Sequence, residues 1–199
     1  WDEAMQSLAI VIVSVGLSAL LGVPLGIAMA KNPLVSRAIA PVLDLMQTIP
    51  SFVYLIPVAM LLGLGKVPAI LATIIYALPP LVRLTDLGLR LIEKELLEAA
   101  DAFGATARQR LLSVELPLAV PNILQGINLT TMMSLAMVVI ASMIGAPGLG
   151  KTVLEGLQRA DGGKGLIGGL AIVVLAIVLD RITQAFGARS LMTRADGKS

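Results

Sequence analysis

The sequence predicts an all-α polytopic membrane protein with about five transmembrane helices. The chain has 199 residues, of which 57% are apolar and only 14% are charged. A soluble domain, by comparison, is about 25% charged. The mean hydropathy is +0.91. Because a helical span needs roughly 20 apolar residues, this length accommodates about five spans and their connecting loops.

The composition excludes several classes of function. The chain has no cysteine and no histidine, which rules out disulfides, thiolate or imidazole metal sites and Ser–His or Cys–His nucleophiles. We therefore expect no catalytic residue and no metal site. A net charge of +2 is too small to indicate a nucleic-acid-binding protein. The chain begins at Trp1 and shows no secretory signal, so we expect a fragment or a processed product.

Five apolar runs are the candidate spans. They cover residues 5–30, 39–64, 67–84, 123–144 and 166–186. Proline interrupts several of them: we expect Pro24 to kink the first span, Pro50 and Pro57 to interrupt the second, and Pro79-Pro80 to lie near the end of the third.

Small residues recur at every fourth position of the first run. This spacing puts them on one helical face, where another helix can approach closely in lipid. The residues are Ser14, Ser18, Gly22, Gly26 and Ala30.

The basic residues predict the orientation. If the polar segment 83–116 is cytoplasmic, eleven basic residues lie on that side and four on the other. The N-terminus is then outside and the C-terminus inside. The cytoplasmic set is Lys31, Arg37, Arg83, Arg90, Lys94, Arg108, Arg110, Arg181, Arg189, Arg194 and Lys198; the outer set is Lys66, Lys151, Arg159 and Lys164.

The polar segment contains a spaced motif. Glu98-Ala99-Ala100 is followed after three residues by Gly104, and nine residues later comes Val114-Glu115-Leu116-Pro117. This spacing resembles the EAA motif of ABC importer permeases. The resemblance implies two short helices, joined at the glycine, that dock into a groove of a cytosolic ATPase subunit. It also implies the type I importer permease fold, called MetI-like.

The chemistry of the motif fits a docking role. Ala99, Ala100, Phe103 and Ala107 have helical spacing and can form one apolar face, while Glu98 can pair with a basic group of the partner. Gly104 permits a bend, and we expect Pro117 to end the helix before the next span. Helical periodicity alone favours an amphipathic helix at the membrane interface; the complete motif favours docking. The predicted ATPase-coupling residues are Glu98, Ala99, Ala100, Phe103, Gly104, Val114, Leu116 and Pro117, within a coupling segment 93–117.

The resemblance extends over nearly the whole chain. It includes residues 47–51, 76–83 and 175–184 and the glycine-rich stretch after Ile144. These segments are similar to permeases of glycine betaine/proline betaine and choline uptake systems. The resemblance implies a single permease domain over residues 1–199 that moves an osmoprotectant inward.

Residues 145–152 match the phosphate-loop pattern G-x-x-x-x-G-K-[ST], with Lys151 and Thr152 at its end and Asp180 as a conceivable metal ligand. A phosphate loop follows a buried strand, whereas this stretch follows a candidate span. The predicted topology also puts Lys151 outside the cell. We therefore interpret the stretch as a flexible external loop rich in glycine, suited to contact a binding protein.

Three acidic residues lie in or near spans. Asp86 has Arg83 and Arg90 within helical reach, Asp180 adjoins Arg181, and Asp44 lies near the cytoplasmic side. Structural roles are favoured over a proton relay for all three.

Aromatic residues make up only 3% of the chain, too few for the aromatic cages that grip quaternary ammonium groups. The resemblance places high-affinity binding on a separate extracytoplasmic protein and leaves a weak passage here. The candidate lining of that passage, which helix packing would explain equally well, is Pro50, Ser51, Tyr54, Thr130, Thr131, Met133, Ser134 and Met137.

The sequence and the resemblance together predict a permease that works as a homodimer in the lipid of the bacterial inner membrane. It binds no cofactor, while ATP and Mg are held by the ATPase partner. The alternatives are a permease for another solute such as methionine or an alkanesulfonate, a membrane-embedded nucleotide-binding protein, and a channel without an ATPase.

Overall fold

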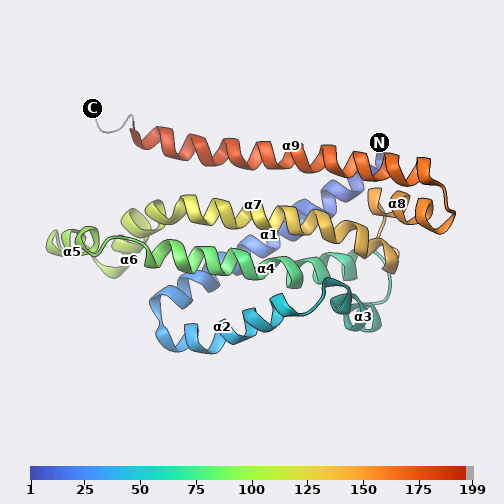
Figure 1. Cartoon of the computed structure of the whole chain (residues 1–199). Helices are drawn as coiled ribbons and strands as arrows, with labels where there is room; N and C mark the ends of the chain where they lie inside the picture. Colours follow the sequence, from blue (N-terminus) through green and yellow to red (C-terminus); the bar gives the residue numbers. More distant parts are fainter. Residues whose placement is uncertain (196–199) are drawn as a thin grey trace.

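The computed structural model describes residues 1–195, with side chains through Ala185 (Figure 1). Every regular element in this part of the chain is helical. The elements are α1 (Asp2–Lys31), α2 (Pro33–Thr48), α3 (Ser51–Leu62), α4 (Lys66–Arg90), α5 (Lys94–Ala102), α6 (Ala107–Arg110), a π-helical turn (Leu111–Glu115), α7 (Leu116–Ala141), a 3-10 turn (Ser142–Ile144), α8 (Leu149–Gln158) and α9 (Gly162–Ala195). Predictions that involve the side chains of Phe186, Arg189, Arg194 and Lys198 lie outside the described residues.

Helix α4 is the centre of the bundle. It packs along both α1 and α7, while α9 lies along the outer side of α7 (Figure 1). More than half of the most apolar stretch of α4 is buried, against 6% for α9. The largest group of buried apolar side chains comes from α1, α3, α4 and α7. Its members include Ile10, Leu55, Ala72, Leu135 and Met137.

The small-residue face predicted for α1 is confirmed at four of its five positions, and the fifth, Ala30, is half-buried. Ser14, Ser18, Gly22 and Gly26 are buried, and Gly22 and Gly26 lie against α4. A Cβ atom on Gly26 would stand 2.6 Å from Cβ of Thr85 and 2.7 Å from the carbonyl oxygen of Val82. The two backbones are therefore too close for any side chain at this position.

The second predicted span, residues 39–64, is not one straight helix. Helices α2 and α3 meet at a bend of 100°. Ile49 is extended (φ −73°, ψ 126°) because the ring of Pro50 disfavours a helical residue before it. The interruption predicted at Pro50 is confirmed, whereas the one predicted at Pro57 is wrong, because α3 runs through Pro57 to Leu62.

The bent pair nevertheless crosses the bundle. Helix α2 begins beside Lys31, which pairs with Glu115 at the end that holds α5 and α6. The turn after α3 reaches the opposite end, where the amide of Gly65 donates to the carbonyl of Ile144 (2.9 Å). The four long apolar helices, with this pair counted as one broken span, give five candidate crossings, in agreement with the predicted all-α membrane fold.

The prolines at 79–80 and at 117 do not end helices. Helix α4 continues through Pro79-Pro80 to Arg90, about six residues beyond the predicted end of this span at residue 84. In the turn before them, the Thr130 hydroxyl of α7 donates to the carbonyl of Ala77 (3.0 Å), which is how neighbouring helices support proline-containing spans. Pro117 does not end a helix: it is the second residue of α7, inside a helical stretch that runs from Ala107 to Ile144.

The remaining span boundaries move outward. Helix α7 starts at Leu116 and not near residue 123, and α9 starts at Gly162 and not near residue 166. Helix α1 runs through Pro24 as one element. The glycine-rich stretch after Ile144 is not a flexible loop throughout, because Leu149–Gln158 form α8, which packs against α9.

We predict that Gly26→Ala destabilises the bundle, because the added methyl group meets Thr85 and the Val82 carbonyl. Overpacking of this kind costs about 1–3 kcal/mol. Gly16→Ala is the matched control on the same helix, since its Cβ meets nothing within 4 Å. The thermal unfolding midpoint of each purified variant tests the prediction. Equal midpoints for the two variants would contradict the close packing of α1 on α4.

Candidate functional site

The motif-bearing segment forms a helical hairpin that projects from one end of the bundle (Figure 1). Helices α5 and α6 are joined at Gly104, whose φ of +77° is a left-handed conformation that favours glycine. The Thr106 side chain then caps α6, and Gln109 bonds back to the amide of Thr106 (2.9 Å). The bend predicted at Gly104 is therefore present and is followed by a defined helix start.

The first half of the motif faces outward. Glu98, Ala99, Phe103 and Gly104 are exposed, and Ala100 is half-buried. The Phe103 ring is 93% exposed and has almost no cover from its own chain. An aromatic side chain held on a hairpin in this way suits insertion into a partner's groove.

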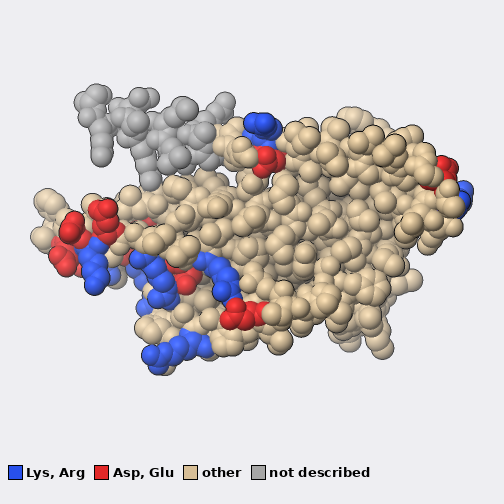
Figure 2. All heavy atoms as spheres, viewed as in Figure 1, with Lys and Arg blue, Asp and Glu red and all other residues tan. Residues whose placement is uncertain are grey.

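The second half of the motif anchors the hairpin. Val114, Leu116 and Pro117 are half-buried in the π-helical turn and the first turn of α7. Most charged side chains of the visible face gather at this end of the molecule, whereas the face toward the opposite end is nearly uncharged up to a small charged group at its tip (Figure 2). This distribution agrees with the predicted polar segment at one membrane face.

The residue between Val114 and Leu116 is a site residue that the sequence analysis missed. Glu115 is 2% exposed and is the only charged residue among the buried side chains of the described part of the chain. One carboxylate oxygen accepts from Nε of Arg110 (3.0 Å), and the other pairs with Nζ of Lys31 at the end of α1. Leaving such a carboxylate without partners costs about 3–5 kcal/mol in a folded protein.

The same arginine extends the network to α5. Nη1 of Arg110 donates to both carboxylate oxygens of Asp101, at 2.8 and 2.7 Å. Asp101, Arg110, Glu115 and Lys31 thus form one connected set, which we call the Glu115 network. The available sequence signal was a lone acidic residue between two apolar ones, but its partner on α1 is too distant in the sequence for any local pattern to identify.

The candidate passage residues fall into two groups. Pro50, Ser51 and Tyr54 lie at the bend between α2 and α3, where the Tyr54 hydroxyl donates to the carbonyl of Met46. On α7, Met133 is half-buried, while the others are buried inside the subunit. These buried residues are Thr130, Thr131, Ser134 and Met137.

The buried hydroxyls on α7 bond to backbone. Thr131 Oγ1 donates to the Ile127 carbonyl (2.8 Å) and Ser134 Oγ to the Thr130 carbonyl (2.7 Å). Met137 belongs to the main apolar core. In this conformation helix packing accounts for these positions, and the structure does not bring them together with Pro50 and Ser51 around one open passage.

The phosphate-loop match has neither the fold nor the free amides that nucleotide binding needs. The elements before it are the helix α7 and the 3-10 turn Ser142–Ile144, and not a strand. At the start of α8, the Gly148 amide donates to the Glu3 carboxylate (2.7 Å) and the Leu149 amide to the Ser7 hydroxyl (2.8 Å). A carboxylate therefore occupies the position where a phosphate would bind. We exclude the nucleotide-binding interpretation for this stretch.

Ion pairs close the hairpin of α8 and α9. Glu155 pairs with Lys164 and, at 3.9 Å, with Lys151. The hydrogen bond and the charge of Lys164 hold the pKa of the Glu155 carboxyl below its ordinary value. Lys151, the lysine of the phosphate-loop match, thus takes part in a local surface ion pair.

The acidic residues near the spans have protein partners. Asp86 accepts from Arg90 (2.7 Å), as expected, and Asp44 pairs with Arg83. Asp180 bonds to the side-chain amides of Asn128 (3.0 Å) and Gln184 (2.7 Å), not to its neighbour Arg181. These contacts support the structural roles predicted for all three.

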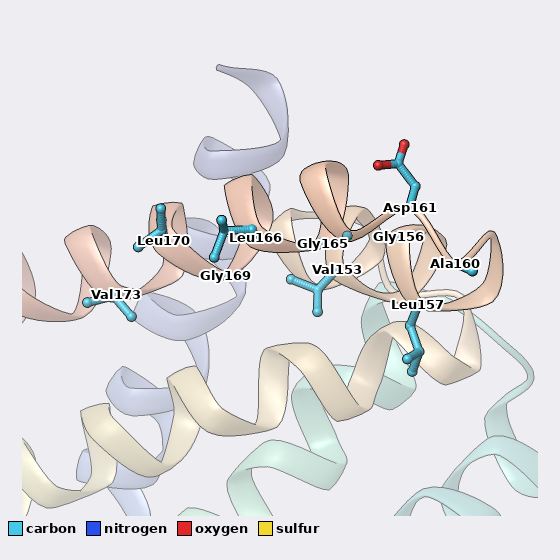
Figure 3. Close-up of a pocket in the computed structure, with 11 residues that line it drawn as sticks. Val153, Gly156, Leu157, Ala160, Asp161, Gly165, Leu166, Gly169, Leu170 and Val173 are labelled. Atoms are coloured by element: carbon cyan, nitrogen blue, oxygen red, sulfur yellow. The ribbon is translucent and has the colours of Figure 1, made fainter.

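An apolar cavity of about 850 Å³ opens between α8 and α9 (Figure 3). Small and aliphatic residues line it, with Asp161 at its rim. The Asp161 carboxylate points away from the aliphatic lining and accepts from the amide of Lys164 (3.0 Å), which caps α9. The described lining has no aromatic ring, so the cavity lacks the features that bind a quaternary ammonium group.

Helical crossings, a projecting hairpin at one end and a short helix at the other are the features of a multi-pass membrane protein. Residues 22–191 match the family model described as "Binding-protein-dependent transport system inner membrane component". The chain belongs to this family.

Two curated relatives are about half identical to the chain. ProW, the glycine betaine/proline betaine transport system permease protein of Escherichia coli (strain K12), is 51% identical over 190 residues, covering 96% of this chain and 54% of ProW. GbuB, the glycine betaine/carnitine transport permease protein of Listeria monocytogenes (serotype 1/2a, strain 10403S), is 50% identical over 190 residues, covering 96% of this chain and 67% of GbuB. The chain thus spans about half to two thirds of these relatives. The resemblance to betaine permeases is confirmed.

A solved structure supports the fold. A chain of the MetNI methionine ABC transporter, crystallised in inward-facing conformations, superposes with a TM-score of 0.77 at 25% identity. The match covers 96% of this chain and 93% of that one. The MetI-like fold prediction is confirmed.

Proposed function

We propose that this chain is the permease subunit of an ATP-driven importer for glycine betaine, proline betaine or a related quaternary ammonium osmoprotectant. The observation that carries the proposal is the complete EAA spacing on an exposed hairpin, in a chain half identical to permeases named for betaine. The chain is not an enzyme in this proposal: ATP and Mg are bound by a separate cytosolic ATPase subunit.

The hairpin is the proposed contact with the ATPase. In the coupling segment 93–117, Phe103 and the alanines at 99 and 100 enter an apolar groove, and Glu98 meets a basic group at its rim. Val114, Leu116 and Pro117 hold the hairpin on α7. The exposure of Phe103 supports this assignment, because an uncovered aromatic ring outside the apolar spans needs a partner surface.

The opposite end is the proposed contact with a substrate-binding protein. Helix α8 and the α8–α9 turn lie there, together with the basic residues predicted to be outside. This arrangement has the N-terminus outside and the hairpin in the cytoplasm. Two copies of the chain enclose the passage, with the α2–α3 bend at Pro50, Ser51 and Tyr54 as the proposed lining and Met133 facing it from α7.

The buried residues of α7 have a different proposed place in the cycle. Thr130, Thr131, Ser134 and Met137 pack inside the subunit in this conformation. Their hydroxyls already bond to backbone carbonyls, so they can line a passage only if α7 rotates. They are therefore the weaker part of the proposed lining.

Uptake by the reconstituted transporter tests the substrate class. We predict ATP-dependent uptake of glycine betaine or proline betaine into proteoliposomes that contain the permease, its ATPase and the binding protein. Methionine and alkanesulfonates should not be taken up. Uptake of one of these in place of the betaines would contradict the substrate assignment, and downhill flux without ATP would favour a channel.

We predict that Glu98→Lys and Phe103→Ala abolish most ATP-driven uptake while the protein still folds and inserts. Phe103 makes almost no contact within its own chain, so its loss removes only contact with a partner. Removal of a central aromatic anchor costs about 2 kcal/mol or more of binding. Co-purification of the ATPase and uptake are the two measurements. Trp1→Ala is the matched control for co-purification of the ATPase, because Trp1 is 91% exposed but lies at the end away from the hairpin. Unchanged uptake in both hairpin variants would contradict the docking assignment.

A further inference from the structure

We infer that Glu115 is the positioning residue through which the docking hairpin holds the cytoplasmic end of α1. The inference rests on the proposed function, because it concerns how movement of an ATPase reaches the spans. It depends on a contact outside the motif pattern: the motif leaves the position between Val114 and Leu116 open, and this chain places a buried carboxylate there.

Glu115 joins two elements that otherwise have little contact. Lys31 is the last residue of α1, and Arg110 is the last residue of α6. Both cations share one carboxylate, with Arg110 on Oε1 and Lys31 on Oε2. Nη1 of the Arg110 guanidinium also donates hydrogen bonds to the carboxylate of Asp101 on α5. A displacement of the hairpin therefore moves the carboxylate and, with it, the end of α1.

The solvent exposures of the three side chains show why Glu115 depends on both of its partners. Its side chain is 3% exposed, whereas those of Lys31 and Arg110 are 39% and 29% exposed. The cations are accessible to water, but the carboxylate has no solvent to replace a lost partner. Loss of either contact would leave part of a buried carboxylate unpaired, so both contacts favour a fixed position of the hairpin relative to the end of α1.

The π-helical turn Leu111–Glu115 sets the direction of the side chain. A π turn contains about one residue more than an α turn, which rotates the following side chains by roughly 100° about the helix axis. Glu115 is the last residue of this turn and points inward, while Leu112 remains half-exposed. The turn thus lets an acidic residue reach α1 at the start of a membrane helix.

Helix α1 is also attached at its far end. Glu3 and Ser7 accept from the first amides of α8, at 2.7 and 2.8 Å. Between the two attachments, α1 is a continuous helix that packs closely on α4. A force applied through Glu115 can thus travel along α1 to α8.

The test is a double-mutant cycle on the complete reconstituted transporter, with ATP hydrolysis and solute uptake measured together. We expect Glu115→Gln and Lys31→Met each to lower the solute moved per ATP hydrolysed by roughly five-fold or more, while the ATPase stays bound. We expect the double variant to be no worse than the poorer single variant, because both changes break one link. Lys31→Arg keeps the charge, so this variant should retain most of the solute moved per ATP hydrolysed by the unmodified transporter.

Arg83→Met is the matched control. It removes an ion pair at the same end with similar exposure, 40% for the arginine, but with an exposed carboxylate as partner. This variant should keep its coupling ratio within about two-fold, since exposed pairs contribute little. Unchanged coupling in both Glu115→Gln and Lys31→Met, or additive losses in the double variant, would overturn the inference.

A distance measurement tests the link apart from transport. Spin labels on cysteines introduced at Leu34 and Ala102 of this cysteine-free chain report how firmly the hairpin is held against the α1 end. The spin-labelled chain without further substitutions should give one narrow distance distribution. Adding Glu115→Gln or Lys31→Met should broaden that distribution. Distance distributions of equal width in the background and both variants would overturn the link, whatever the uptake measurements show. Failure of the unmodified transporter to take up any betaine would contradict only the proposed function.

Discussion

Close approach of α1 and α7 to α4 is the contact on which the rest of the structure depends. In lipid, apolar surface alone gives helices little reason to associate, so packing between small residues has to hold them together. A Cβ on Gly126 of α7 would stand 2.9 Å from Leu81, and one on Gly88 of α4 would stand 2.8 Å from Asn122. Together with Gly26 on α1, these glycines make α4 the centre to which both neighbours are fitted.

The polar contacts occur where this packing ends. At one end the Glu115 network ties α1 to the hairpin, and at the other Glu3 and Ser7 tie it to α8. Each contact satisfies a group that would otherwise be buried without a partner: a carboxylate in one case and helix-start amides in the other. The bundle thus has an apolar middle that sets the helix arrangement and two polar ends that join it to the surfaces proposed for its partners.

Hydropathy and small-residue spacing were sufficient to predict the class of fold, the approximate spans and the buried face of α1. The errors arose where tertiary contacts override local preference. Pro79-Pro80 stay inside α4 beside a hydroxyl from α7, and the glycine-rich stretch becomes α8 because Glu3 and Ser7 cap its start. The EAA spacing identified the hairpin, but Glu115 remained unnoticed, since its pairing with Lys31 joins residues far apart in the sequence. The candidate passage was the least predictable part, because Thr, Ser and Met serve equally in helix packing.

The roles proposed for the two ends of the bundle require that these ends face opposite sides of the membrane. Because the chain lacks cysteine, single cysteines at Ala105 and Lys151 can be labelled with a membrane-impermeant thiol reagent in oriented vesicles. The account predicts that residue 105 is labelled only from the cytoplasmic side and residue 151 only from the outer side. Labelling of residue 151 from the cytoplasm would contradict the five-crossing topology and the assignment of the two ends to an ATPase and a binding protein.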